Sequence, residues 1–208
     1  MKPIKQPLVV GIAGIMGSGK STVAGVFEAL GAKRVDADQL GKAMLREPAV
    51  KAAVIEAFGS GVTDAGGEID TVKLGKLAFA SPDNARRLDR VTREPLISRI
   101  KARVEELAPT SEVIVVDAAL LPEWNAKPWL DVLLVVDSEE EHAVARLEAN
   151  PRFKHVDVRA RMKHQFERSR KTAAADMVIP NYGSLEDLKA RARAIFRTLG
   201  DMRDKGKG

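Results

Sequence analysis

Two continuous apolar runs, VIVVD at residues 113–117 and VLLVVD at residues 132–137, constrain the fold of this chain most strongly. Both runs are rich in β-branched residues and neither alternates with polar residues. Strands of this kind are buried on both faces, as in parallel sheets with helices above and below. Similar apolar segments recur along the chain with helical patterns between them, and this alternation predicts a doubly wound α/β fold.

The apolar segments predict one parallel sheet of five strands, at residues 8–15, 33–36, 112–117, 131–137 and 176–180. Helices are expected at residues 21–30, 39–46, 49–58, 71–80, 83–107, 139–149, 157–172 and 184–199. Between the second and third strands lie about 75 mostly helical residues, far more than a crossover connection needs. We therefore expect a helical subdomain over one end of the sheet, and a frayed polar tail at residues 201–208.

The loop between the first expected strand and the first expected helix carries a phosphate-binding motif. Its sequence GIMGSGKS matches G-x-x-x-x-G-K-[ST], and the strand before it and the helix after it are the context that the motif requires. Glycines let backbone N–H groups converge on phosphate oxygens at a helix N-terminus. The residues expected to bind nucleotide phosphates are Gly14, Ile15, Met16, Gly17, Ser18, Gly19, Lys20, Ser21 and Thr22.

Within this loop, Lys20 is expected to bring a positive charge to the β- and γ-phosphates. Ser21 is expected to be a ligand of Mg²⁺, and Thr22 to contact the α-phosphate or stabilise the first helical turn. The motif identifies a phosphate site. It leaves open whether the nucleotide is hydrolysed, donates a phosphoryl group or acts as a switch.

Carboxylates follow three of the expected strands, at the sheet edge where ligands bind in open α/β folds. The spacing of Asp36 and Asp38 can place one carboxylate toward the Mg²⁺ region and the other near an acceptor hydroxyl. The alternative is that Asp38 is only the N-cap of the next helix. Asp117 has the form of a Walker-B acid that holds Mg²⁺ directly or through water. Asp137 is expected to be a helix N-cap.

Residues 146–171 are the most basic part of the chain, with nine Lys and Arg residues against three acidic ones. An Asn-Pro pair breaks the helical pattern here, and a helix, a basic loop and a returning helix are typical of a lid over phosphates. Lid arginines stabilise charge on a transferring phosphoryl group. The alternatives are a solvated helix face or a nucleic-acid surface, for which only Phe153 and Phe166 supply aromatic rings.

Composition narrows the setting in which we expect this protein to work. The net charge of +5 favours anionic partners, and the absence of cysteine excludes disulfides and thiolate metal sites. No stretch reaches the roughly 18 apolar residues of a membrane span, so we expect a cytoplasmic protein with no membrane partner. The three histidines lack metal-site spacing and are expected on the surface, and we expect Trp124 and Trp129 to pack rather than to bind substrate.

Taken together, these motifs resemble those of the dephospho-coenzyme A kinases, a family of the P-loop kinase group. The family pattern is matched in order by GIMGSGKSTV (14–23), DAD (36–38), FG and an LG…F helix (58–79), DAALLPE (117–123), Arg146, Gln165 and ADMVIPNYG (175–183). The resemblance implies a three-layer P-loop kinase sandwich with a five-stranded parallel sheet, a helical acceptor-binding subdomain and a small lid. It implies transfer of the γ-phosphoryl group of ATP to the 3′-hydroxyl of dephospho-CoA.

The resemblance also implies roles where residues match the family pattern. Asp38 is implied as the base toward the 3′-hydroxyl and Arg146 as a phosphate-clamping arginine, so these two and Lys20 are the expected catalytic residues. Asn181 and Gly183 are implied as neighbours of the ATP adenine. Ser21 and Asp117 remain the expected Mg²⁺ ligands.

The chain departs from the family pattern on the acceptor side and in the lid. The acceptor-side departures are Glu94, Ala119 and Pro122. In the lid, Asn150 stands where a second arginine is common, and Arg152 and Lys154 are the candidates to replace it.

We expect a single domain over residues 1–200, with a core at 7–38, 108–149 and 173–200, the acceptor subdomain at about 39–107 and the lid at about 146–172. The expected partner is dephospho-CoA and not a nucleic acid, and the sequence does not set the oligomeric state. Two alternatives stay open. One is a P-loop kinase acting on a nucleoside, nucleotide or other small molecule; the other is a nucleic-acid-binding ATPase that uses the basic segment.

Overall fold

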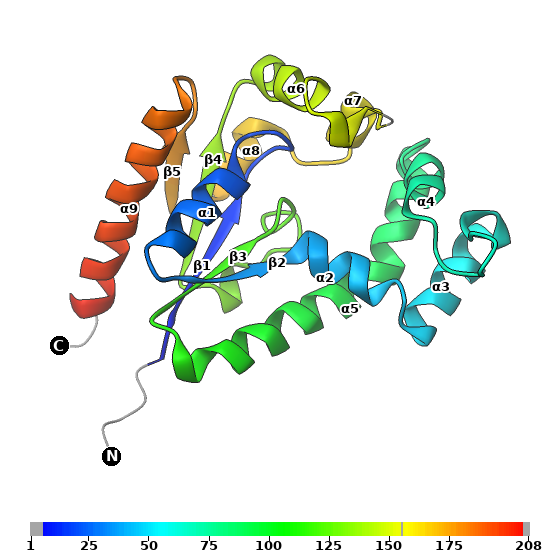
Figure 1. Ribbon diagram of the computed structural model, residues 1–208, viewed down its shortest axis with the longest axis horizontal. Helices are drawn as coiled ribbons and strands as arrows, with labels where there is room; N and C mark the ends of the chain where they lie inside the picture. The colour runs from blue at the N-terminus through cyan, green and yellow to red at the C-terminus, as the bar shows by residue number, and fades with distance from the viewer. Residues whose placement is uncertain (1–5, 155, 206–208) are drawn as a thin grey trace.

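The computed structural model describes residues 6–154 and 156–205, and these contain one five-stranded sheet (Figure 1). Its strands are β1 (Leu8–Ala13), β2 (Lys33–Asp36), β3 (Val113–Asp117), β4 (Val132–Asp137) and β5 (Met177–Pro180). The strand order is β2-β3-β1-β4-β5, and all neighbouring strands are parallel, which confirms the predicted fold class. Because β1 lies between β3 and β4, the sheet has its topological switch point at the end of β1.

Helices cover both faces of the sheet and so give the predicted three layers. On one face lie α1 (Lys20–Ala29) and α9 (Leu185–Lys205), where the rings of Phe27 and Phe196 are 5.1 Å apart between centroids. On the other face lie α5 (Pro82–Leu107), α8 (Arg168–Ala174) and the loop after β3. Trp124 and Trp129 pack against the core of that face, as predicted.

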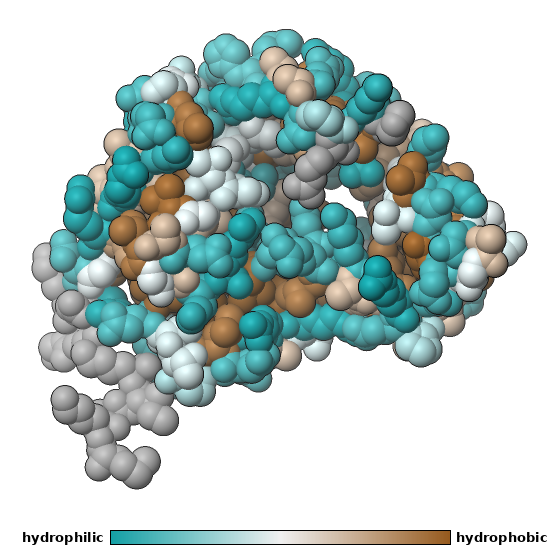
Figure 2. All heavy atoms as spheres, in the orientation of Figure 1, coloured by the Kyte–Doolittle hydropathy of each residue, from teal (hydrophilic) through white to brown (hydrophobic). Residues whose placement is uncertain are grey.

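Two groups of helices extend beyond the sheet, and each includes one helix that also covers its second face. Residues 37–107, here called the helical extension, contain α2 (Ala37–Met44), α3 (Pro48–Phe58), α4 (Thr71–Ala78) and α5, with a small apolar core of their own. Residues 146–172, here called the lid segment, contain the end of α6 (Glu140–Glu148), α7 (Val158–Met162) and most of α8. α7 faces α4 (Figure 1), and the space-filling surface is hollowed between them (Figure 2). Among the helices of the described residues, none has the length and apolar character needed to cross a bilayer.

Two predicted boundaries at the sheet are wrong. β1 ends at Ala13 rather than at residue 15, because Gly14 adopts a φ of 146° and turns the chain away from the sheet. α9 continues through 201–205, where a frayed tail was expected, because Arg203 pairs with Glu112 at 2.5 Å. Residues 206–208 of that tail lie outside the described residues.

The single helix predicted over 157–172 is also wrong, since α7 and α8 are separate helices. Two tertiary hydrogen bonds replace the helical ones in the link between them. Gln165 Oε1 accepts from the backbone N–H of Met16 at 3.1 Å, and the backbone N–H of Phe166 donates to Glu123 Oε1 at 2.8 Å. The lid segment is therefore attached to the phosphate-binding loop at this link.

Candidate active site

The P-loop, residues 14–21, leaves β1 at the switch point of the sheet. Gly17 and Gly19 show why this loop needs glycine. Gly17 has a φ of 79°, and a Cβ there would lie 2.5 Å from the carbonyl oxygen of Ala143. Gly19 has a φ of 101°, and its Cβ would lie 2.8 Å from Asn181 Nδ2. Only glycine combines a positive φ with such close backbone approach, so the path of the loop is fixed at both positions.

The N-terminus of α1 is open to an anion. Its N-cap is Gly19, which has no side chain to accept the first N–H groups, whereas α2, α4 and α5 are capped by Asp36, Asp70 and Ser81. Uncapped N–H groups and the helix dipole together attract phosphate. Ser21, in this first turn, is exposed.

Side-chain donors bind four carbonyl groups of the P-loop. The contacts are Lys20 Nζ with the oxygens of Gly14 (3.3 Å) and Ile15 (3.0 Å), Arg146 Nη1 with that of Gly17 (2.9 Å), and Asn181 Nδ2 with that of Ser18 (2.8 Å). The N–H groups of Met16 and Ser18 are also bonded within the protein, so the N–H groups at the start of α1 are the ones positioned for phosphate oxygens. The structure thus brings Lys20, Arg146 and Asn181 together at the loop.

Desolvation lowers the pKa of the Lys20 ammonium to about 8. The carboxylate of Asp117 opposes this shift and the ammonium of Lys171 adds to it. A cation with little water around it interacts strongly with phosphate, because the local dielectric constant is low. Lys20 is therefore well placed for the role that the motif predicts.

Asp117 lies at the carboxyl edge of the sheet, directly beside Asp36 in the register of β3 and β2. Its side chain is buried, and Oδ2 accepts from Arg34 Nη2 at 2.5 Å. Burial raises the pKa of this carboxyl group, while the cations of Arg34 and Lys20 oppose the increase. Arg34 was not singled out from the sequence, although its position two residues before Asp36 puts both on one face of β2.

The N-cap of α2 is Asp36, whose Oδ1 accepts from the backbone N–H of Gln39 at 3.0 Å. The alternative in which Asp38 caps this helix is therefore wrong. Asp38 lies in the first turn of α2 with its carboxylate exposed, close enough to act electrostatically on Lys20 and on Arg161. It has the freedom that a proton acceptor for a bound hydroxyl needs.

Ser21 and Asp117 fit a Mg²⁺ site of the kind that takes most of its ligands from phosphate and water. The Ser21 hydroxyl is exposed at the open end of α1, and Asp117 acts electrostatically on the adjacent Lys20. No group of three or more metal-binding side chains occurs among the described residues. His142 is exposed and His164 half-buried, while His155 lies outside this part of the chain.

The chain after β5 contacts the P-loop through Asn181, whose Nδ2 donates to the Ser18 carbonyl. Asn181 is buried, and its carbonyl oxygen accepts from Arg146 Nη2 at 3.4 Å. Gly183, two residues on, lies on the surface beside the Asp187 carboxylate, where a Cβ would be 2.8 Å from Oδ2.

The prediction that Asp137 caps a helix is wrong. The N-cap of α6 is Glu139, which makes no side-chain capping bond. Asp137 instead accepts from Arg168 Nε at 2.6 Å and Nη2 at 2.9 Å, and also from the hydroxyl of Tyr182. Although burial acts to raise it, the pKa of Asp137 is lowered by these hydrogen bonds. The ion pair ties α8 to the end of β4.

Lys171 is a second buried charge that sequence reasoning missed. Its side chain is fully buried, and Nζ donates to the carbonyl oxygen of Ala119 at 2.7 Å and to Glu123 Oε1 at 2.6 Å. Burial lowers the pKa of this ammonium, and Glu123 opposes the shift. Nothing in the sequence distinguished Lys171 from the other cations of its segment.

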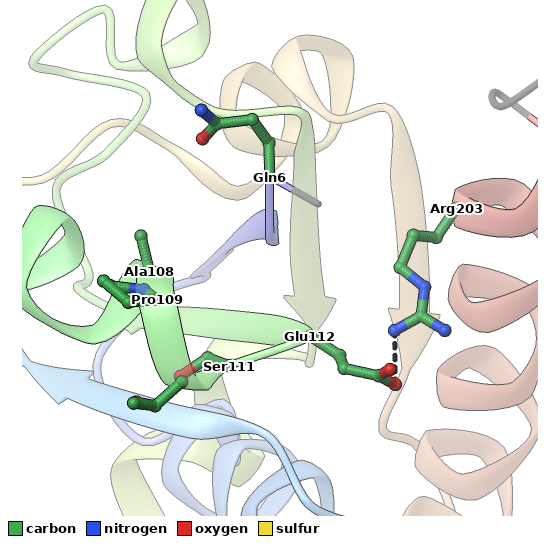
Figure 3. A pocket seen from close by; sticks show the side chains of 7 residues that line it. Gln6, Ala108, Pro109, Ser111, Glu112 and Arg203 are labelled. Atoms are coloured by element: carbon green, nitrogen blue, oxygen red, sulfur yellow. Dashed lines mark ion pairs between the residues drawn. The ribbon is translucent and has the colours of Figure 1, made fainter. Parts of the chain in front are cut away.

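A shallow pocket at the opposite edge of the sheet is unrelated to this site. It is lined by Gln6, residues 108–112 and Arg203, and the ion pair of Arg203 with Glu112 crosses it (Figure 3). It lies at the amino end of β1 and β3, whereas the P-loop follows the carboxyl end of β1.

A sequence model of the dephospho-CoA kinase family matches residues 8–187, which include the P-loop, Asp38, Asp117, Arg146 and Asn181. This chain belongs to the dephospho-CoA kinase family. The dephospho-CoA kinase of Frankia casuarinae is 37% identical over 94% of this chain and 85% of its own. That of Syntrophotalea carbinolica is also 37% identical, over 92% of both chains.

Solved structures agree with this membership. A Thermus thermophilus protein of known crystal structure has a TM-score of 0.74 and 30% identity, over 94% of this chain and 99% of its own. The dephospho-CoA kinase of Campylobacter jejuni has a TM-score of 0.60 over 92% and 96% of the two chains, and at 20% identity it supports the fold alone.

The positions that depart from the dephospho-CoA kinase pattern differ in their surroundings. Ala119 uses its backbone carbonyl to hold Lys171, a contact that does not depend on its side chain. Glu94 is mostly exposed and lies 3.7 Å from Arg93. Lys154 is exposed, and the side chain of Arg152 lies outside the described residues.

The lowered pKa of Lys20 predicts proton uptake on nucleotide binding. At pH 8 about half of the nucleotide-free molecules carry a neutral Lys20, and bound phosphates favour the ammonium form, so binding should take up roughly half a proton. Titration calorimetry with ATP at pH 8, in two buffers of different ionisation enthalpy, measures this uptake. The Lys20→Arg variant, whose guanidinium stays protonated, should show no proton uptake. Equal heats in both buffers for the wild-type protein would contradict the prediction.

Asn181→Ala should weaken ATP binding about fivefold to tenfold, because one neutral hydrogen bond to the P-loop is worth about 1 kcal/mol. The matched control is Asn84→Ala, which removes a similar amide bond, from Asn84 Nδ2 to the carbonyl oxygen of Leu77 at 2.9 Å, in the helical extension. Binding of a fluorescent ATP analogue measures both variants. Equal ATP affinities for Asn181→Ala and the wild-type protein would show that the hydrogen bond from Asn181 to the Ser18 carbonyl does not shape the phosphate site.

Proposed function

We propose that this protein transfers the γ-phosphoryl group of ATP to the 3′-hydroxyl of dephospho-CoA, giving coenzyme A and ADP. The observation that supports this best is a P-loop that leads into an uncapped helix N-terminus, with an exposed carboxylate, Asp38, in the field of Lys20, in a chain of the dephospho-CoA kinase family. The helical extension would bind the acceptor and the lid segment would cover the transfer site.

The donor half of the reaction would rest on charge neutralisation and positioning, which dominate phosphoryl transfer. The N-terminus of α1 and Lys20 would bind the β- and γ-phosphates, and Thr22 the α-phosphate. Arg146, which donates to the Gly17 carbonyl, would also donate from its guanidinium to the phosphoryl group in transfer. Asn181 would keep the loop in shape, and Gly183 would lie near the adenine.

Ser21 and Asp117 would hold Mg²⁺, which when bound neutralises charge on the β- and γ-phosphates. Arg34 would keep the Asp117 carboxylate oriented through its 2.5 Å contact. The Asp117 oxygen not bonded to Arg34, Oδ1, would face the ion or its water.

On the acceptor side, Asp38 would orient the 3′-hydroxyl and accept its proton. The hydroxyl oxygen forms a bond to the γ-phosphorus, the bond from that phosphorus to the bridging oxygen breaks, and ADP leaves. The lid segment would exclude water, because water in an open site would take the phosphoryl group instead. The proposal includes a cytoplasmic setting, where ATP and Mg²⁺ are plentiful.

A coupled assay of ADP release tests the acceptor. Dephospho-CoA should be turned over much faster than any member of a panel of nucleosides, nucleoside monophosphates, shikimate and gluconate. ATP hydrolysis should not rise on addition of RNA or DNA, because the acceptor would be a small molecule and not a nucleic acid. No turnover of dephospho-CoA, or stimulation by nucleic acid, would contradict the proposal.

Asp38→Asn should lower kcat by about a hundredfold or more with little change in ATP affinity, because it removes the proton acceptor and leaves the P-loop intact. Asp201→Asn, which changes an exposed carboxylate of α9, is the control. Steady-state kinetics with both substrates measures the effect. If Asp38→Asn keeps near-wild-type turnover, Asp38 is not the base.

A further inference from the structure

Arg161 belongs to the lid segment, yet its guanidinium contacts the helical extension. It lies on α7, and Cζ is 4.9 Å from the ring centroid of Phe79, which ends α4. The same group faces Gly75 on α4, where an added Cβ would lie 2.7 Å from Arg161 Nη2. The ring of His164 also lies against Phe79, at 5.8 Å between centroids. Gly75 and Phe79 thus form a seat for an arginine of the facing helix α7.

The guanidinium on this seat has unused hydrogen-bond donors. In the described parts of the chain, 6–154 and 156–205, it makes no hydrogen bond or ion pair with a protein acceptor. The lid-segment cations that pair with carboxylates are Arg159, Arg168 and Lys171. A guanidinium carries five N–H donors, and leaving them unbound in a half-buried position costs free energy unless a ligand binds them. The Arg161 guanidinium is therefore suited to bind an anionic ligand.

The attachment of the lid segment places that anion near the P-loop, because Gln165, four residues after Arg161, accepts from the Met16 N–H at 3.1 Å. Burial lowers the pKa of Arg161, and the one carboxylate that opposes this is Asp38. Asp38 also acts on Lys20, in the P-loop. A ligand bound to Arg161 would therefore lie near both the proposed proton acceptor and the donor phosphates.

We propose that Gly75 and Phe79 hold Arg161 so that its guanidinium binds a phosphate oxygen at the transfer site. The phosphate is either that of the bound acceptor or the γ-phosphoryl group in transit, and kinetics distinguishes the two. This inference rests on the proposed function. It gives the LG…F segment of α4 a physical role, because the glycine leaves space for the guanidinium and the aromatic ring supports its face.

Gly75→Ala separates this role from folding. The new Cβ would displace only the far end of a flexible side chain, and alanine favours the helix by up to about 1 kcal/mol over glycine. The thermal midpoint should stay unchanged or rise. Activity should nevertheless fall by at least about threefold, because displacing a guanidinium from a reacting phosphate weakens its contact.

The experiment compares kcat and both KM values for the wild-type protein, Arg161→Gln, Gly75→Ala and the double variant. Arg159→Gln, two residues along α7 and exposed, is the matched control. Arg161→Gln should lower kcat/KM for dephospho-CoA about ten- to hundredfold, the range for hydrogen bonds to charged groups, and Arg159→Gln should not. A rise in the acceptor KM identifies the acceptor phosphate, and a fall in kcat identifies the γ-phosphoryl group.

In the double variant, Gly75→Ala should cause no further loss, because it acts through Arg161. Equal kinetics for Arg161→Gln and Arg159→Gln would overturn the inference, and so would the same loss from Gly75→Ala with and without Arg161. If the wild-type protein fails to phosphorylate dephospho-CoA, the proposed function fails. The kinetics of the same variants are then compared with whichever acceptor the protein phosphorylates. The same pattern of losses supports the role of Arg161, and its absence overturns that role.

Discussion

The hydrogen bonds to the carbonyl groups of the P-loop determine how the rest of this protein is arranged. Their donors come from three places: Lys20 on α1, Arg146 on α6 and Asn181 after β5. Each element must be in position before the loop can present its N–H groups to a phosphate. A buried carbonyl that loses its donor stays unsatisfied, so the network holds the loop in one shape.

Two cations of the basic segment are bound within the fold. Arg168 is held by Asp137 and Tyr182, and Lys171 is buried against Glu123. These cations join α8 to the sheet and to the loop after β3. Part of the positive charge of this stretch therefore serves the fold. Arg161, which rests on an aromatic ring without a carboxylate partner, differs from them.

Local patterns predicted the sheet, because continuous β-branched runs such as 132–137 have few alternatives to a buried parallel strand. Local patterns also located Lys20, which belongs to the glycine-rich loop, and Asp117, which ends an apolar strand. The errors arose where a distant partner decides. Asp137 has the sequence context of a helix cap, but its carboxylate binds Arg168, 31 residues further along the chain. The helix predicted over 157–172 is interrupted where Gln165 binds the P-loop. Contacts of that range leave no periodic trace in a sequence.

The lid segment is fastened at both ends. Arg146 near its start holds the Gly17 carbonyl, and Gln165 near its end accepts from the Met16 N–H, so both attachments are to the same short loop. A chain fixed at two points has fewer conformations available than a free one, and it loses correspondingly less entropy when it closes on a ligand. Much of the ordering that a freely moving lid would undergo with each catalytic cycle has thus already taken place on folding.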